Sequence, residues 1–322
     1  MATTTSAAAG FQNLVNMAIQ RDLEANLRAQ LHFASPGAFD HYIHKPGTNV
    51  MRRGYVGDLA VDLVNDVLVE GTPNTATTLV IDNDSITAKQ YGKLVSLTDL
   101  TAFMSPYDLA ATATERVTRW VSELLDRLTV SVIDTYAVSS LVLYSGSATS
   151  RATVAAKLTG KDIHTLVGYA RNANVQPFDD GFYRLVVHPR IAIDVGTNDT
   201  ASYGSFEQAV KYDDATPLIA GEIGTFAGCK ILETTICTSF ATAGAGSVDV
   251  IRSYLLGKGA LGIGDVSTME VICTPPGGHG DEFHQIMSLA AKAWLGCKVQ
   301  IASGTRVFVA ESSGTILAAG QH

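Results

Sequence analysis

Two short stretches have residue types and spacing that could support chemistry. The first, GKGALG at residues 257–262, has the glycine spacing of a dinucleotide-binding loop, where backbone N–H groups at a helix N-terminus hold a pyrophosphate. That mechanism needs a strand before the glycines and a helix after them. The residues that follow, Ile263-Gly264-Asp265-Val266, do not begin a helix. We therefore interpret this stretch as a glycine-rich strand that lets two backbones approach closely.

The second stretch could supply metal ligands, because it places four imidazole and carboxylate groups close together: His279, Asp281, Glu282 and His284. Their spacing does not match a zinc-binding helix, and the prolines and glycines at 275–278 predict a solvated loop that enters a strand. His188, next to Pro189, is interpreted as a capping or packing residue rather than a general base. We expect no metal and no cofactor.

The cysteines are widely separated and form no CxxC pair, which argues against zinc and redox sites: Cys229, Cys237, Cys273 and Cys297. Two disulfides are possible in principle, but the N-terminal residues do not have the pattern of a secretion signal, so we expect reduced thiols. The sequence contains no nucleophile elbow and no phosphate-binding loop. We therefore expect no catalytic residues.

The composition argues for a self-associating protein. The 322 residues carry a formal net charge of −8, which argues against a dedicated binder of nucleic acid or anionic membrane. No stretch approaches the roughly 20 apolar residues of a membrane span. Only 17% of the residues are charged while 46% are hydrophobic, so much of the surface is expected to be covered by further copies of the chain.

The first hundred residues divide into a helix and an extended region. Apolar residues at helical spacing over 11–31 predict an amphipathic helix, which either packs on its own domain or reaches a neighbouring subunit. Residues 77–81 and 85–97 resemble strands on either side of an Asp82-Asn83-Asp84 turn. A two-stranded ribbon is marginal in water, so this one must lie on a sheet, a helix or another subunit.

The remainder combines one long helix with alternating helices and strands. From Ser105-Pro106 onward, one apolar stripe over about 30 residues predicts a spine helix of roughly 45 Å. Residues 145–150 have the composition of a linker. Beyond them the pattern predicts these elements: helices at 159–172 and 205–212, strands at 182–187, 252–263 and 269–273, a strand-turn-strand unit at 221–235, and long strands over 283–311.

This order of elements resembles that of the major capsid proteins of tailed bacteriophages with the HK97-like fold. Within that fold, three parts of the chain look like the N-four-like podovirus capsid family: ITAKQYGKLVSLTD at 86–99, LVVHPRIAID at 185–194 with GEIGTFAGCKILETT at 221–235, and DEFHQIMSLAAKAWLG at 281–296. The resemblance extends from about residue 44 to residue 312. It implies an α+β fold with an N-terminal arm, an extended loop, a peripheral domain of spine helix and long β-sheet, and an axial α/β domain.

The resemblance implies the following boundaries: N-terminal arm 1–37, extended loop region 38–100, peripheral domain with the spine helix 101–155, axial domain 156–280, and C-terminal strands 281–322 that return to the peripheral domain. Contacts between subunits are expected on the arm and the loop: Phe11, Leu14, Lys45, Arg52, Arg53 and Tyr55. The implied function is that of a major capsid protein, which assembles through pentamers and hexamers into an icosahedral shell around a double-stranded DNA genome.

The implied partners are further copies of the chain, a portal protein at one vertex, a separate scaffolding protein, and packaged DNA held without sequence-specific contacts. The resemblance leaves a cement protein open and implies no membrane partner. The expected location is the virion, assembled in the cytoplasm of the host bacterium. Two alternatives remain: an encapsulin-type nanocompartment shell, which would have a cargo-peptide pocket, and a soluble α/β enzyme, which would have a deep polar pocket.

Overall fold

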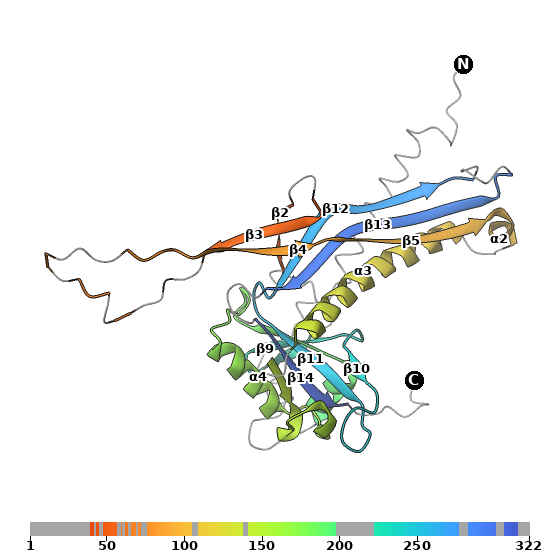
Figure 1. Ribbon diagram of the computed structural model, residues 1–322. Helices are drawn as coiled ribbons and strands as arrows, with labels where there is room; N and C mark the ends of the chain where they lie inside the picture. The colour runs from red at the N-terminus through yellow and green to blue at the C-terminus, as the bar shows by residue number, and fades with distance from the viewer. Residues whose placement is uncertain are drawn as a thin grey trace.

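The computed structural model describes residues 39–41, 43–44, 48–56, 59, 62–63, 66–68, 70–71, 76–104, 109–137, 141–197, 222–276, 283–300 and 306–314. Figure 1 shows three parts: a long flat layer made by a sheet and helix α3, a narrow ribbon that projects away from this layer, and a rounded body below it. None of the helices in these ranges is long and apolar enough to cross a membrane.

The longest helix, α3 (Leu109–Tyr136), connects the flat layer to the body. Its 28 residues correspond to about 42 Å of helix. Apolar residues at helical spacing place Ala113, Val117 and Val121 in a core with the flat sheet. Further along, Val130 and Ile133 belong to the core of the body. The predicted spine helix is thus confirmed, and it is buried in both cores.

The flat layer contains a four-stranded sheet, called here the long sheet, in the order β1-β12-β13-β5. The strand β13 is antiparallel to both of its neighbours, β12 and β5, whereas β1 is parallel to β12. Two register shifts interrupt the pairing of β12 with β13 between Asp265 and Glu270. The strands are β1 (Phe39–His41), β5 (Lys89–Thr98), β12 (Leu261–Thr274) and β13 (Ile286–Val299).

The body is built on a seven-stranded sheet, called here the body sheet, in the order β6-β14-β11-β7-β9-β8, with β10 paired to β11. Its core is rich in branched apolar residues and contains the fully buried Leu185, Ile191 and Tyr254. The strands are β6 (Val142–Tyr144), β7 (Tyr183–Val187), β8 (Glu222–Phe226), β9 (Cys229–Glu233), β10 (Ser239–Phe240), β11 (Val250–Leu256) and β14 (Val307–Ser313).

Two helices of the body follow directly from the sequence. In α4 (Gly160–Asn172), Thr159 and Asp162 form a reciprocal capping box, and the predicted apolar face is buried: Ile163, Leu166, Val167 and Ala170. The helix α5 (Pro189–Thr197) starts after β7. The ring of His188 accepts a hydrogen bond from the backbone N–H of Arg190 at 3.2 Å, which confirms its capping role.

The ribbon consists of β3 (Val50–Val56), β4 (Ile81–Thr87) and the described residues between them, with β2 (Ile43–His44) paired to the base of β3. At this base, Met51 and Ile86 are buried against the long sheet. They pack over Gly264 and Gly296, which are directly paired in the β12–β13 ladder. Because neither glycine has a side chain, the two apolar side chains of the ribbon fit between the strands and the ribbon. We call these four residues the socket.

Several expectations need correction. Asp82, Asn83 and Asp84 do not form a turn; they lie inside β4, where they pair with residues 53–55 of β3. The strand β5 at 89–98, which the resemblance places in the extended loop region 38–100, is a strand of the long sheet. The predicted linker at 145–150 begins with the one-turn helix η2 (Ser145–Ser147), in which Ser145 is buried.

The C-terminal strands also divide differently from the prediction. β13 lies in the long sheet beside α3, as expected, but β14 lies in the body sheet between β6 and β11. The glycine-rich stretch is not a continuous strand: residues 257–260 form the turn between β11 and β12, and Gly259 has a φ of 63°. The helices predicted at 11–31 and 205–212 lie outside the described residues.

Candidate functional site

The predicted contact residues fall into two groups. Phe11, Leu14 and Lys45 lie outside the described residues. Arg52, Arg53 and Tyr55 all lie in β3, so the ribbon brings these three positions together, although the side chain of Tyr55 is outside the description. The ribbon is therefore the first candidate surface.

The two arginines of β3 have different surroundings, because adjacent residues of a strand point to opposite faces. Arg53 is partly buried and is paired in register with Asp84 of β4. The carboxylate of Asp84 accepts a hydrogen bond from the ammonium group of Lys298 at the end of β13. This ion pair joins the ribbon to the long sheet. Arg52 is exposed, and it is the arginine of the pair that a second molecule can reach.

Large apolar side chains are exposed at both ends of the molecule. On the ribbon they are Val56, Leu59, Leu63, Val67, Leu68, Leu79, Val80 and Ile81. At the far end of the long sheet (Figure 1) they are Leu100, Phe103 and Met104 of α2 (Asp99–Met104), together with Phe283 and with Ile286, the first residue of β13. Phe103 is 89% exposed and Leu63 is 84% exposed. Soluble monomers rarely expose so many large apolar side chains, so both ends are candidate contact surfaces.

The sequence analysis missed the surface around α2. A signal was present, because a short apolar stretch that contains Leu100, Phe103 and Met104 ends at Ser105-Pro106. A helix of six residues is too short to bury an apolar face in a core of its own.

The body contains a buried charge network that joins α3 to the body sheet. Glu311 of β14 is fully buried and receives two hydrogen bonds from Arg151, at 2.7 and 2.9 Å, and one from Arg252 at 2.8 Å. Arg252 of β11 also donates to Asp134 of α3 at 2.7 Å. Asp134 accepts further hydrogen bonds from the hydroxyl groups of Thr238 at 2.5 Å and Tyr254 at 3.0 Å.

The pKa of Glu311 reflects this environment. Burial alone raises the pKa of a carboxyl group, but the hydrogen bonds and positive charges of Arg151 and Arg252 outweigh burial and leave the pKa of Glu311 below its ordinary value. Glu311 is therefore an ionised structural residue. It is not poised to exchange a proton near neutral pH.

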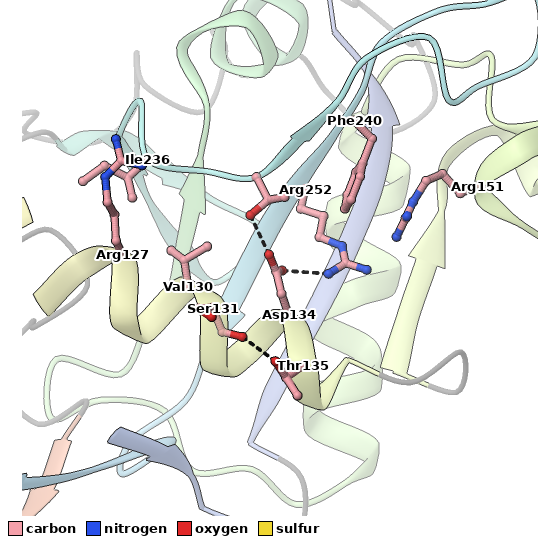
Figure 2. A pocket seen from close by; sticks show the side chains of 10 residues that line it. Arg127, Val130, Ser131, Asp134, Thr135, Arg151, Ile236, Phe240 and Arg252 are labelled. Carbon is pink, nitrogen blue, oxygen red and sulfur yellow. Dashed lines mark hydrogen bonds and ion pairs between the residues drawn. The ribbon is translucent and has the colours of Figure 1, made fainter. Parts of the chain in front are cut away.

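A pocket of about 550 Å³ opens beside this network, as Figure 2 shows. The aromatic ring of Phe240 lies between the guanidinium groups of Arg151 and Arg252, whose central carbons are 3.6 and 5.1 Å from the ring centre. The lining residues are Arg127, Val130, Ser131, Asp134, Thr135, Arg151, Ile236, Thr238, Phe240 and Arg252. The carboxylate of Asp134 already has three donors, so this pocket does not offer a general base.

The other chemical candidates also have structural explanations. The four cysteines carry free thiols, and burial raises the pKa of Cys229 to about 12 and that of Cys297 to about 11. Burial and the charge of Arg190 lower the pKa of His188. Of the four side chains that were considered and rejected as metal ligands, only His284 is described, and its ring contacts the carbonyl oxygen of Pro276 at 3.2 Å. Within the described ranges, no group of three such side chains is arranged to hold a metal ion.

Comparison with solved structures finds the same fold in phage capsids. The capsid of Ralstonia phage GP4 is similar over 91% of this chain and 92% of that chain, with a TM-score of 0.70 and 15% identity. The cyanophage Pam1 capsid is similar over 88% of this chain and 92% of its own chain, with a TM-score of 0.67 and 18% identity. The head structure of Helicobacter pylori bacteriophage KHP40 is similar over 89% of this chain and 91% of its own chain, with a TM-score of 0.65 and 11% identity. No protein-family model and no curated protein matches the sequence.

The chain therefore has the HK97-like capsid fold, in its α+β form with a spine helix, a long sheet and an α/β body. The similarity extends over almost the whole of each capsid chain, so the ribbon, the flat layer and the body belong to one shared architecture. The narrower resemblance to the N-four-like podovirus capsids stays a prediction. The three structures named above are phage capsids or heads, and at 11–18% identity the likeness shows the fold that they share with this chain.

Proposed function

We propose that this chain is the major capsid protein of a tailed bacteriophage. In this role it assembles through pentamers and hexamers into an icosahedral shell that encloses a double-stranded DNA genome. The observation that carries the proposal is a capsid fold over about nine tenths of the chain, on a subunit that exposes apolar side chains at both ends. Such surfaces become stable in water only when other molecules cover them.

The parts of the fold correspond to separate tasks in this proposal. The long sheet with α3 is the peripheral domain, the body is the axial domain that meets its copies around the five- and six-fold axes, and the ribbon is the extended loop that contacts a neighbour. A portal protein, a separate scaffolding protein and DNA held without sequence-specific contacts are further proposed partners, and a cement protein is compatible with them. The proposed location is the virion, after assembly in the host cytoplasm.

Light scattering and negative-stain electron microscopy of the purified chain test the proposal. Closed shells of uniform diameter are the expected result, and nucleic acid rather than an enzyme inside them would distinguish a virus shell from a nanocompartment. Rings of five or six subunits that do not close would support the subunit role and indicate a missing scaffold. A compact monomer at all concentrations would refute the proposal.

The exposed arginine of the ribbon gives a more specific prediction. Reversing its charge with Arg52→Glu should leave soluble monomers or capsomers that do not close, because like charges opposed across an interface are unfavourable by several kcal/mol. The matched control is Arg52→Lys, which keeps the charge and should assemble. Electron microscopy and sedimentation measure both. Normal particles from Arg52→Glu would show that this face of the ribbon makes no subunit contact.

A further inference from the structure

The pocket beside the charge network has a lining that suits an acidic, partly apolar segment. Three arginines and one aspartate line it, together with the apolar side chains of Val130, Ile236 and Phe240. The side chains of Arg127 and Arg151 are 67% and 32% exposed, whereas Glu311, the partner of Arg151, is fully buried. The rim therefore presents positive charge above apolar walls.

The two arginines on either side of Phe240 keep hydrogen-bonding capacity. A guanidinium group has five N–H donors, and the contacts of Arg151 with Glu311 use only its Nε and Nη2. Those of Arg252 use its Nε and Nη1. In the part of the chain that the structure describes, no hydrogen bond engages Nη1 of Arg151 or Nη2 of Arg252. A carboxylate that enters the pocket can accept hydrogen bonds from both.

The ribbon has the complementary chemistry. Between β3 and β4 its described residues include three exposed acidic side chains and three exposed large apolar ones: Asp62, Asp66, Glu70, Leu63, Val67 and Leu68. A hydrogen bond of 2.9 Å from the amide of Asp66 to the carbonyl oxygen of Asp62 closes a turn, so that acidic and apolar side chains follow one another closely. We call this stretch the ribbon tip.

A chain cannot place this ribbon tip in its own pocket. Figure 1 shows the ribbon running away from the molecule on the side opposite β10, which carries Phe240 of the pocket. The contact therefore requires a second copy. A single contact of this kind between two copies leaves the pair with one free ribbon tip and one free pocket. Repeated around an axis, such contacts close into a ring.

We propose that the pocket lined by Arg127, Arg151 and Arg252 receives the acidic ribbon tip of a neighbouring copy. This inference rests on the proposed function, because it specifies which surface of the neighbour the extended loop contacts. The carboxylates meet the arginines of the rim, and an apolar side chain such as Leu63 lies against Phe240 and Val130. A basic segment would be repelled by the three arginines, and a purely apolar segment would cover the free guanidinium donors of Arg151 and Arg252 without offering them an acceptor.

Disulfide trapping in assembled particles tests the contact directly. The chain with Leu63→Cys and Ser131→Cys places one thiol on the ribbon tip and one on the exposed rim of the pocket. After mild oxidation, we expect covalent dimers and higher rings at about tenfold the level of the unsubstituted chain and of a matched pair, Leu63→Cys with Thr112→Cys. Thr112 is also exposed on α3 but does not line the pocket.

A charge reversal provides the second measurement. Arg127 is exposed and makes only an (i, i+4) ion pair with Glu123, so Arg127→Glu should leave the fold intact. We expect it to reduce the assembled fraction about tenfold, while the matched Arg119→Glu on the same helix assembles normally. Assembled particles without the specific cross-link, together with normal assembly of Arg127→Glu, would overturn the pocket contact and leave the capsid role standing. A chain that never assembles would overturn both.

Discussion

Replacing Glu311 by glutamine tests how strongly the buried network holds α3 to the body sheet. The substitution keeps the shape of the side chain and removes its charge. In the folded chain the carboxylate accepts three hydrogen bonds from two arginines and has no exposed surface. After the substitution, two guanidinium groups remain beside a neutral amide whose N–H₂ group points at one of them.

The expected loss of stability depends on how far water can hydrate the two arginines once the charge of Glu311 is removed. The side chain of Arg252 is 8% exposed, so its charge cannot be rehydrated without opening the body, whereas that of Arg151 is 32% exposed and can be partly rehydrated. Breaking a buried ion pair by removing one partner lowers stability by about 3–5 kcal/mol. We expect a loss in this range, or a fall in melting temperature of roughly 6–20 °C.

The assay is urea unfolding of the unassembled chain, followed by circular dichroism and by the fluorescence of the tryptophans. The matched control is Glu123→Gln, which breaks the exposed pair with Arg127 and should change stability by at most about 0.5 kcal/mol. A loss below about 1 kcal/mol for Glu311→Gln would refute the reasoning, because it would mean that water already reaches both arginines.

Two further predictions concern the socket and the effect of acid. A β-carbon at position 296 would lie 2.5 Å from Ile86 Cγ2, a branched side chain with little freedom, whereas one at position 264 would meet the end of the flexible Met51 side chain. Gly296→Ala should therefore destabilise the base of the ribbon by about 1–3 kcal/mol and speed its proteolytic cleavage. Gly264→Ala should have a smaller effect. Equal cleavage rates of the two variants would contradict this packing. The pKa of Glu311 is lower in the folded chain than the ordinary glutamate pKa of 4.5. The contribution of Glu311 to folding stability is therefore complete above pH 4.5 and is lost as the pH falls through the lower folded-state pKa. Unfolding free energies measured from about pH 7 to pH 3 should fall less steeply for Glu311→Gln than for the original chain, and parallel curves would show that another carboxyl group carries the acid sensitivity.

The elements that sequence reasoning predicted well are those with strong local signals. α3 and α4 have unbroken apolar periodicity, and α4 adds a capping box of Thr159 and Asp162 that fixes its first turn. His188 and Pro189 marked the end of β7, whereas the helix α5, which begins at Pro189, was not predicted. These signals depend on neighbours within a few residues, so one sequence is enough to recognise them.

The errors come from information that is not local. Asp82, Asn83 and Asp84 have the composition of a turn, but the ribbon exposes most of its side chains, so polar residues fit its strands. The strands β13 and β14 belong to different sheets, and neither strand's own residues identify the distant strands with which it pairs. The charge network could not be predicted from the sequence, because only the fold brings together its four residues: Asp134, Arg151, Arg252 and Glu311.

The ribbon packs on the long sheet at the socket, and the rest of the ribbon projects from this point of attachment. Among the residues that the structure describes, Met51, Ile86 and Ala88 form the buried cluster at the base of the ribbon. Val56 lies five residues beyond Met51, which is about 17 Å along an extended strand. A rotation of about 10° at the base therefore moves Val56 by about 3 Å, without any change in the core of the long sheet or of the body. In the proposed shell, copies of the chain with identical cores would therefore contact their neighbours at slightly different angles through small rotations of the ribbon.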